Sequence, residues 1–182
     1  MAPTLGDYEM RTRALLALII GAGFWLGAGA HAQQQPALPA AAPSPSPEYG
    51  LPLTNAQARD AAAAALAEAK TNNWRMAIAI VGPDGELLYF ERMDGTQNAS
   101  AALAQRKART SALFRRPSKV FVDQFAAGNT GFMSFPDEAR PIASEGGIPI
   151  ILDGKLVGAI GASGGTGQQD GVAAAAGANA VK

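Results

Sequence analysis

Two turn segments constrain the fold of this chain more than any other feature, because each joins two runs of strand-forming residues. The first, Gly82-Pro83-Asp84-Gly85-Glu86, lies between residues 76–81 and residues 87–93. Its proline presets the φ of a turn and its glycines supply positive φ. The second, Asp153-Gly154, interrupts a run at residues 148–162 and is a strong short hairpin signal. Hairpins make antiparallel neighbours, so we expect an antiparallel sheet and no βαβ dinucleotide unit.

Helices are expected around these hairpins. A capping box, Thr54 to Gln57, opens a run of strong helix formers. The expected N-caps of the later helices are Asn98 or Ser100, then Ser118, then Asp170. Four helices are predicted, at about residues 55–71, 99–114, 119–127 and 171–182. The predicted fold class is therefore α+β, a single domain in which helices cover one antiparallel sheet.

The N-terminus has the pattern of an export signal. Residues 14–30 are apolar and uncharged, follow Arg11 and Arg13, and precede Ala30-His31-Ala32, a small-x-small cleavage site. We expect cleavage after Ala32 and a periplasmic or secreted protein, with a retained membrane anchor as the alternative. Residues 33–52 hold six of the twelve prolines and are predicted to form a disordered linker. Residues 53–182 then form the folded domain.

Composition removes several function classes. The chain has 15 basic and 15 acidic residues, so its formal net charge is zero, which argues against a nucleic-acid binder. It has no cysteine and one histidine, His31, which the predicted cleavage removes. A Ser-His-Asp triad, a cysteine nucleophile and an ordinary zinc site are then excluded. Residues 161–165 match the G-x-S-x-G pattern of hydrolases, but no histidine remains to serve as their base.

Three features have both a functional and a structural interpretation. Arg92 and Asp94 either form an ion pair or bind a ligand carboxylate. Lys107 either faces a ligand or extends from the edge of the core. A stripe of alanines on the predicted second helix allows close approach by another helix or another subunit; its members are Ala101, Ala104, Ala108 and Ala112.

Several motifs, taken in order, resemble the GlcG/HbpS family. They are the segment Arg92 to Gly95, Lys107-Ala108, the segment Gly146 to Ile150, the Asp153-Gly154 hairpin, the segment Gly158 to Gly165, and Asp170. The resemblance covers residue 53 to about residue 177. It implies a profilin-like fold and homo-oligomers of up to eight subunits. It also implies a shared ligand pocket lined by Arg92, Asp94, Lys107, Gly146, Gly147, Ser163, Gly164 and Asp170.

The resemblance further implies haem as a ligand, because a secreted family member binds it and acts beside a sensor kinase. Without histidine or cysteine, iron needs a weaker ligand such as threonine, methionine or tyrosine. Thr130 is our first expectation, followed by Met133 and Tyr89, with Phe132 and Phe135 covering a porphyrin face. Because the ring must supply most of the binding free energy, we expect a dissociation constant of roughly micromolar.

Three hypotheses follow. The first is an exported protein that binds haem or another small ligand, accessory to a sensor or a dehydrogenase. The second is an enzyme acting on a small 2-oxo or 2-hydroxy acid, with Arg92 holding the carboxylate and Lys107 as acid or base. The third is a structural protein that forms a ring through the alanine stripe. The sequence favours the first and assigns no catalytic residue.

Overall fold

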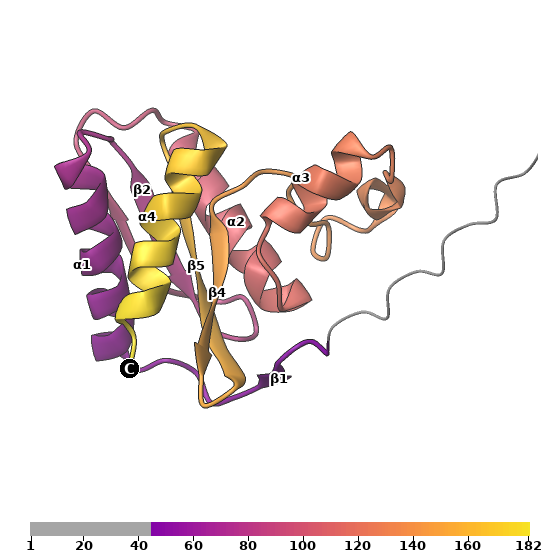
Figure 1. The fold of residues 1–182 in the computed structure, drawn as a ribbon, viewed down its shortest axis with the longest axis horizontal. Helices are drawn as coiled ribbons and strands as arrows, with labels where there is room; N and C mark the ends of the chain where they lie inside the picture. Colours follow the sequence, from indigo (N-terminus) through magenta and orange to yellow (C-terminus); the bar gives the residue numbers. More distant parts are fainter. Residues whose placement is uncertain (1–44) are drawn as a thin grey trace, which may run out of the picture. The chain divides into compact units, whose positions relative to one another are not determined.

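The computed structural model describes residues 45–182, which form a five-stranded sheet with helices on both faces (Figure 1). The strands are β1 (Glu48–Tyr49), β2 (Ala77–Val81), β3 (Leu87–Arg92), β4 (Gly147–Leu152) and β5 (Lys155–Ser163). The helices are α1 (Asn55–Thr71), α2 (Ser100–Phe114), α3 (Lys119–Ala126) and α4 (Gly167–Ala180), with a short 3-10 helix η1 (Gly131–Ser134). The predicted α+β class is confirmed. The predicted signal and most of the predicted linker lie outside the described residues.

Strand β5 is the centre of the sheet. It pairs antiparallel with β4 on one side and with β2 on the other, and β2 continues into the hairpin with β3. Both predicted hairpins are therefore present. The sequence did not predict β1, which lies inside the expected linker and pairs in parallel with Lys155 and Leu156. So short a strand carries no periodicity by which a sequence could reveal it.

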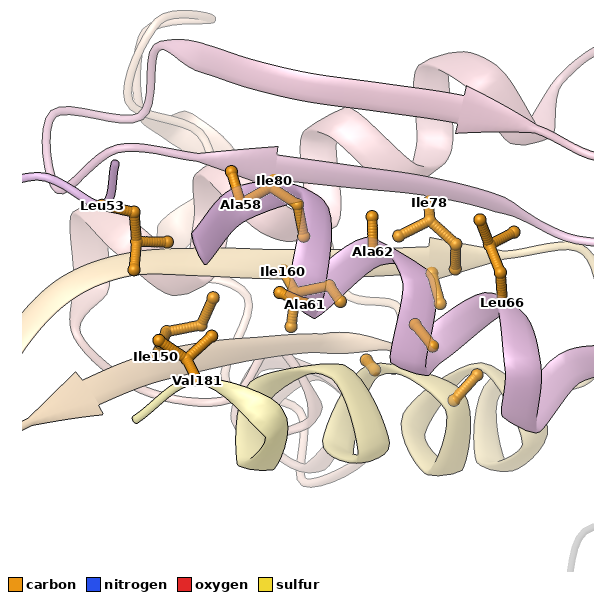
Figure 2. Packing of buried hydrophobic residues seen from close by; sticks show 14 of the residues in the cluster. Leu53, Ala58, Ala61, Ala62, Leu66, Ile78, Ile80, Ile150, Ile160 and Val181 are labelled. Carbon is orange, nitrogen blue, oxygen red and sulfur yellow. The ribbon is translucent and has the colours of Figure 1, made fainter. Parts of the chain in front are cut away.

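The strands alternate their side chains between two cores. Ile78, Ile80 and Ile160 face α1 and α4, where alanines let the two helices lie close to the sheet and to each other (Figure 2). Ala77, Ala79 and Val81 face α2 on the other side. The sheet is thus a middle layer, with α1 and α4 on one face and α2 on the other.

The alanine stripe of α2 packs inside the molecule. Ala104, Ala108 and Ala112 are fully buried against Ala77, Ala79 and Ala159 of the sheet. The prediction that this stripe joins subunits into a ring is therefore wrong. The small alanine side chains instead allow α2 to pack close to the sheet of the same chain.

Several predicted helix caps are also wrong. The N-cap of α2 is Ala99, which makes no side-chain bond, so neither Asn98 nor Ser100 caps it. Ser118 is the N-cap residue of α3, as predicted, but its side chain makes no capping bond; its hydroxyl donates to the Ser144 carbonyl and accepts the Gly147 N–H. Helix α4 begins four residues earlier than predicted, because Thr166 and Gln169 form its capping box. The predicted cap, Asp170, instead binds a lysine across the fold.

Candidate functional site

A buried ion pair joins the helices on the two faces of the sheet. The Lys107 ammonium on α2 donates to Asp170 Oδ2 on α4 at 2.7 Å and to the Ala162 carbonyl at 3.1 Å. The two side chains are only 2% and 4% exposed. The second carboxylate oxygen of Asp170 accepts the Gly165 N–H at 2.9 Å. Each buried charge thus has both an opposite charge and a further hydrogen bond, as burial requires.

Two glycines make room for this pair. Gly146 has φ +118°, and a Cβ there would lie 2.7 Å from the Ala162 carbonyl oxygen and 3.1 Å from the Lys107 ammonium. A Cβ at Gly147 would overlap the Lys107 carbonyl oxygen. The Gly-Gly dipeptide therefore lets the start of β4 lie directly against α2, where a larger residue would push the two apart.

Six of the eight residues predicted to line a pocket meet around this pair. Ser163 is buried, with its Oγ 3.5 Å from Ser100 Oγ, and Gly164 lies against the backbone of Arg75 with φ +152°. The other four are Lys107, Gly146, Gly147 and Asp170. The side chains of Lys107, Ser163 and Asp170 are almost fully buried, so the cluster is closed in this conformation. Its role in ligand binding stays a prediction.

The remaining two predicted residues, Arg92 and Asp94, lie outside this cluster at the exposed end of β3. Arg92 donates to the Asn98 side-chain oxygen at 3.3 Å, and no ion pair joins it to Asp94 among the described residues. Both residues border an open hollow of about 540 Å³ together with Lys70 and Arg75. Arg92 and Ser163 both lie opposite Ala77, on the two strands that flank β2. The predicted set therefore divides into a buried cluster and an exposed pair.

Four aromatic rings form a second candidate site beyond the sheet, where α2 meets α3 and η1. Phe114 and Phe135 are stacked with centroids 6.4 Å apart, and Phe121 contacts Phe114 at 4.9 Å and Phe132 at 5.5 Å edge to face. Three apolar side chains of this region stay exposed: Phe125 at 50%, Met133 at 52% and Phe135 at 40%. We call these three residues the arm surface.

The expected haem contacts divide between two places. Thr130, Phe132, Met133 and Phe135 lie together in and beside η1, where Phe132 is 92% buried and supports the neighbouring rings. Tyr89 lies on β3, at the edge of the sheet away from β4, and packs on the α1 side. Its hydroxyl donates to Glu91 Oε2 at 2.9 Å, and this hydrogen bond raises the pKa of Tyr89 above its ordinary value. The Tyr89 hydroxyl is therefore already hydrogen-bonded to Glu91 and lies apart from the other expected haem contacts.

Two arginines that the sequence did not single out hold the long segment between α3 and β4. Arg106 donates to the carbonyl oxygens of Asp137 and Arg140, each at 3.3 Å. Arg109 reaches the carbonyl oxygens of Gly85 and Glu138. Their spacing of three residues puts both arginines on one side of α2. This spacing was the only sequence feature that indicated a shared role. Their backbone partners could not be read from side-chain identity.

Neither candidate site resembles a metal centre. Residues 45–182 contain no group of three or more His, Cys, Asp and Glu side chains placed to hold an ion. The same part of the chain has no helix long and apolar enough to cross a membrane.

Comparison with known proteins gives consistent matches. Residues 53–179 match the family model described as "Haem degrading protein HbpS-like". The chain is similar to protein GlcG of Escherichia coli strain K12, with 40% identity over 96 residues, or 53% of this chain and 69% of that protein. A crystal structure of a double mutant of Streptomyces reticuli HbpS aligns with TM-score 0.66 and 29% identity over 80% of this chain and 98% of that chain. The crystal structure of a PduOC:heme complex aligns with TM-score 0.67 and 25% identity over 72% of this chain and 96% of that chain.

Proposed function

Because the chain belongs to the HbpS-like family, we propose that it binds haem, and that the arm surface receives the porphyrin ring. One observation carries the placement. Phe125 on α3, Met133 in η1 and Phe135 at the end of η1 expose apolar area, and Phe135 belongs to the group of four packed aromatic rings. Binding sites for large apolar ligands are lined mainly by such side chains. The similarity to the PduOC:heme complex supports the choice of ligand.

The residues of the arm surface fit the ring better than they fit the iron. Residues 45–182 have neither histidine nor cysteine, and the donors expected from the sequence in this segment are the Met133 thioether and the Thr130 hydroxyl. When bound, haem would bring a redox-active iron to this surface. The protein's own contribution is to bind the ring through apolar contacts and to offer a weak neutral ligand. We therefore expect binding at roughly micromolar haem.

Haemin titration of the full-length His31→Ala chain tests this proposal, because that variant removes the only imidazole. We expect a saturable shift of the Soret band. Met133→Ser and Phe135→Ser should each weaken binding about tenfold, since each loses the burial of one apolar side chain. Val172→Ser is the matched control, because Val172 is 44% exposed on α4, away from the arm surface, and should bind haem normally.

Two results would overturn the proposal in different ways. The absence of a saturable shift would remove haem as the ligand. Equal affinity of the three serine variants would keep haem but place it elsewhere on the protein.

The buried ion pair counts against the alternative that the protein is an enzyme using Lys107 as its acid or base. Lys107 is 2% exposed and already bound to Asp170 and Ala162, so a substrate has no contact with its ammonium in this conformation. Arg92 is exposed, yet it lies outside the buried cluster that holds Lys107. The proposed function therefore has no catalytic residue.

We also propose that the protein is exported and cleaved after Ala32, as the apolar segment before it indicates. Cleavage would remove His31 and leave a chain without imidazole. N-terminal sequencing of the protein from the periplasm or the medium tests this. A product that begins at Gln33 is expected, and a full-length membrane-bound chain would contradict the proposal. A sensor kinase or dehydrogenase as partner stays a prediction.

A further inference from the structure

The two edges of the sheet differ in how they are protected. At the β4 edge, the Gly147 N–H donates to the Ser118 hydroxyl at 2.9 Å, and the Gly147 carbonyl accepts the Ser118 N–H at 3.0 Å. Further along, Pro149 has no N–H to offer. A covered end and an edge proline are common means of preventing further strand pairing. The β4 edge is thus closed to another strand.

The β3 edge has no such protection among residues 45–182. Met93 donates its N–H to the Met76 carbonyl, so the alternation of an antiparallel pair turns Tyr89 and Glu91 toward β2. The backbone groups of Phe90 and Arg92 then point away from the sheet. No hydrogen bond within the described residues satisfies them. Strand β3 therefore offers free backbone donors and acceptors along its outer side.

The first four side chains of this edge are aliphatic or aromatic, whereas Glu91 and Arg92 at its end are charged and exposed. Leu87 is 48% exposed, and Leu88, Tyr89 and Phe90 are partly exposed. The stretch contains no lysine and no proline. An apolar, unpaired edge of this kind is a template for another strand.

We propose that β3 pairs with β3 of a second copy of this chain, antiparallel, about a two-fold axis at Phe90. The strand is self-complementary in this register. Phe90 lies opposite Phe90, and Tyr89 lies opposite Glu91 on both sides of the axis. Tyr89 and Glu91 share one face of the sheet, because they pair with Ile80 and Ile78. The phenol of one copy then meets a carboxylate of the other, the same contact that Tyr89 makes within its own chain.

Pairings of the two β3 strands about a neighbouring residue have less favourable side-chain contacts than the pairing about Phe90. An axis at Glu91 would place two carboxylates directly opposite each other, which is destabilising. An axis at Tyr89 would place Tyr89 opposite Tyr89 and Glu91 opposite Leu87, so the contact between phenol and carboxylate across the axis would be lost. The contact between Tyr89 and Glu91, and the separation of the two Glu91 carboxylates, thus favour an axis at Phe90. The resulting contact is isologous, so it closes as a dimer and joins two sheets into one.

Cysteine cross-linking tests the register directly, because the chain has no cysteine of its own. In the proposed pair the two Cα atoms of residue 90 are about 5.5 Å apart, within the range of a disulfide. Under mild oxidation, Phe90→Cys should convert to a covalent dimer that dithiothreitol reverses. Ile151→Cys is the matched control, because Ile151 is 41% exposed on the protected β4 edge, and it should form no covalent dimer. Equal cross-linking of the two variants, or none in either, would overturn the proposal.

Because Phe90 also packs on the α2 side of the sheet, a measurement on the unsubstituted full chain completes the test. Backbone amide exchange should be slow at Phe90 and Arg92 in concentrated protein and become fast on dilution. Tyr89 and Glu91, bonded to β2, should stay protected throughout. Fast exchange at Phe90 at every concentration would overturn the pairing. Protection that survives all dilution would also overturn it, since another part of the same chain would then cover the edge.

Discussion

At the scale of single residues, Lys107 and Asp170 are the most consequential pair. Removing a charge from water costs several kcal/mol, and the pair repays this only while both partners and their extra hydrogen bonds are present. Lys107 also bonds Ala162, and Asp170 also bonds the Gly165 N–H, so both conditions are met here. The pair ties α2 to α4 around the end of β5.

Lys107→Met is expected to lower the free energy of unfolding by about 3–5 kcal/mol, because it leaves the Asp170 carboxylate buried without a cation. Adding Asp170→Asn should recover much of this loss, since the amide oxygen still accepts the Gly165 N–H. Urea denaturation measures both variants. Lys119→Met removes the exposed pair with Asp123 and serves as the control, with no measurable change expected. A Lys107→Met variant as stable as the control would refute the role given to the pair.

Tyr89 gives a second residue-scale prediction, on pH. The hydrogen bond to Glu91 raises its pKa, and the charge of Arg59 lowers it by a smaller amount. Glu91→Gln should therefore lower the pKa of Tyr89, and Arg59→Gln should raise it. Ultraviolet titration of phenolate absorbance distinguishes the two directions, and shifts of the same sign would contradict the assignment.

The raised pKa of Tyr89 also fixes the sign of its effect on stability. A phenol whose pKa is higher in the folded chain favours folding below its unfolded pKa of about 10. This contribution is lost as the pH rises through the folded pKa. Glu91→Gln should reduce the loss of stability above pH 10.

At the scale of elements, the sequence predicts best where the signal is local. Helix α1 has the predicted bounds because Thr54 and Gln57 form their capping box within the helix itself. The two hairpins follow from their turn residues. Ser118 and Asp170 were assigned to caps because of their residue types, yet each found a stronger partner elsewhere in the fold. A local pattern cannot show such competition.

The candidate site shows the same limit. The motifs brought together Lys107, Asp170 and their glycines, but did not reveal that these residues close against one another. Closure depends on α2 lying against Gly147 and Gly161, contacts between segments far apart in the sequence. Of the arm surface, Met133 and Phe135 were singled out from the sequence, and Phe125 was not. Its supports Phe114 and Phe121 were missed, because aromatic residues on helices usually indicate only a core.

Gly161→Ala tests the close approach of α2 to β5. A Cβ at Gly161 would overlap the Ala104 carbonyl oxygen and lie 2.6 Å from the Ala108 nitrogen, both in the backbone of α2. We expect a loss of about 1–3 kcal/mol, seen as a lower Tm in a thermal melt. Gly131→Ala is the control, because nothing lies within 4 Å of its Cβ position. Equal melting temperatures for the two variants would mean that α2 does not lie so close.

At the scale of the whole molecule, residues 45–182 combine a closely packed centre with two exposed surfaces. The sheet and its three packed helices bury the charged pair, whereas the arm surface and the β3 edge remain open. Arg106 and Arg109 of α2 hydrogen-bond to the long segment between α3 and β4. This segment contains Met133 and Phe135 of the arm surface. Haem binding and self-association are therefore expected to use different surfaces and to be separable by substitution.

The spin state of iron in the haem-saturated protein tests the central claim most directly. Electron paramagnetic resonance of the full-length chain and of its His31→Ala variant would be compared. A neutral oxygen or thioether ligand without imidazole predicts saturable binding in both, with the same high-spin ferric spectrum. A low-spin spectrum that is lost in His31→Ala, or no saturable complex in that variant, would contradict haem binding by the folded domain.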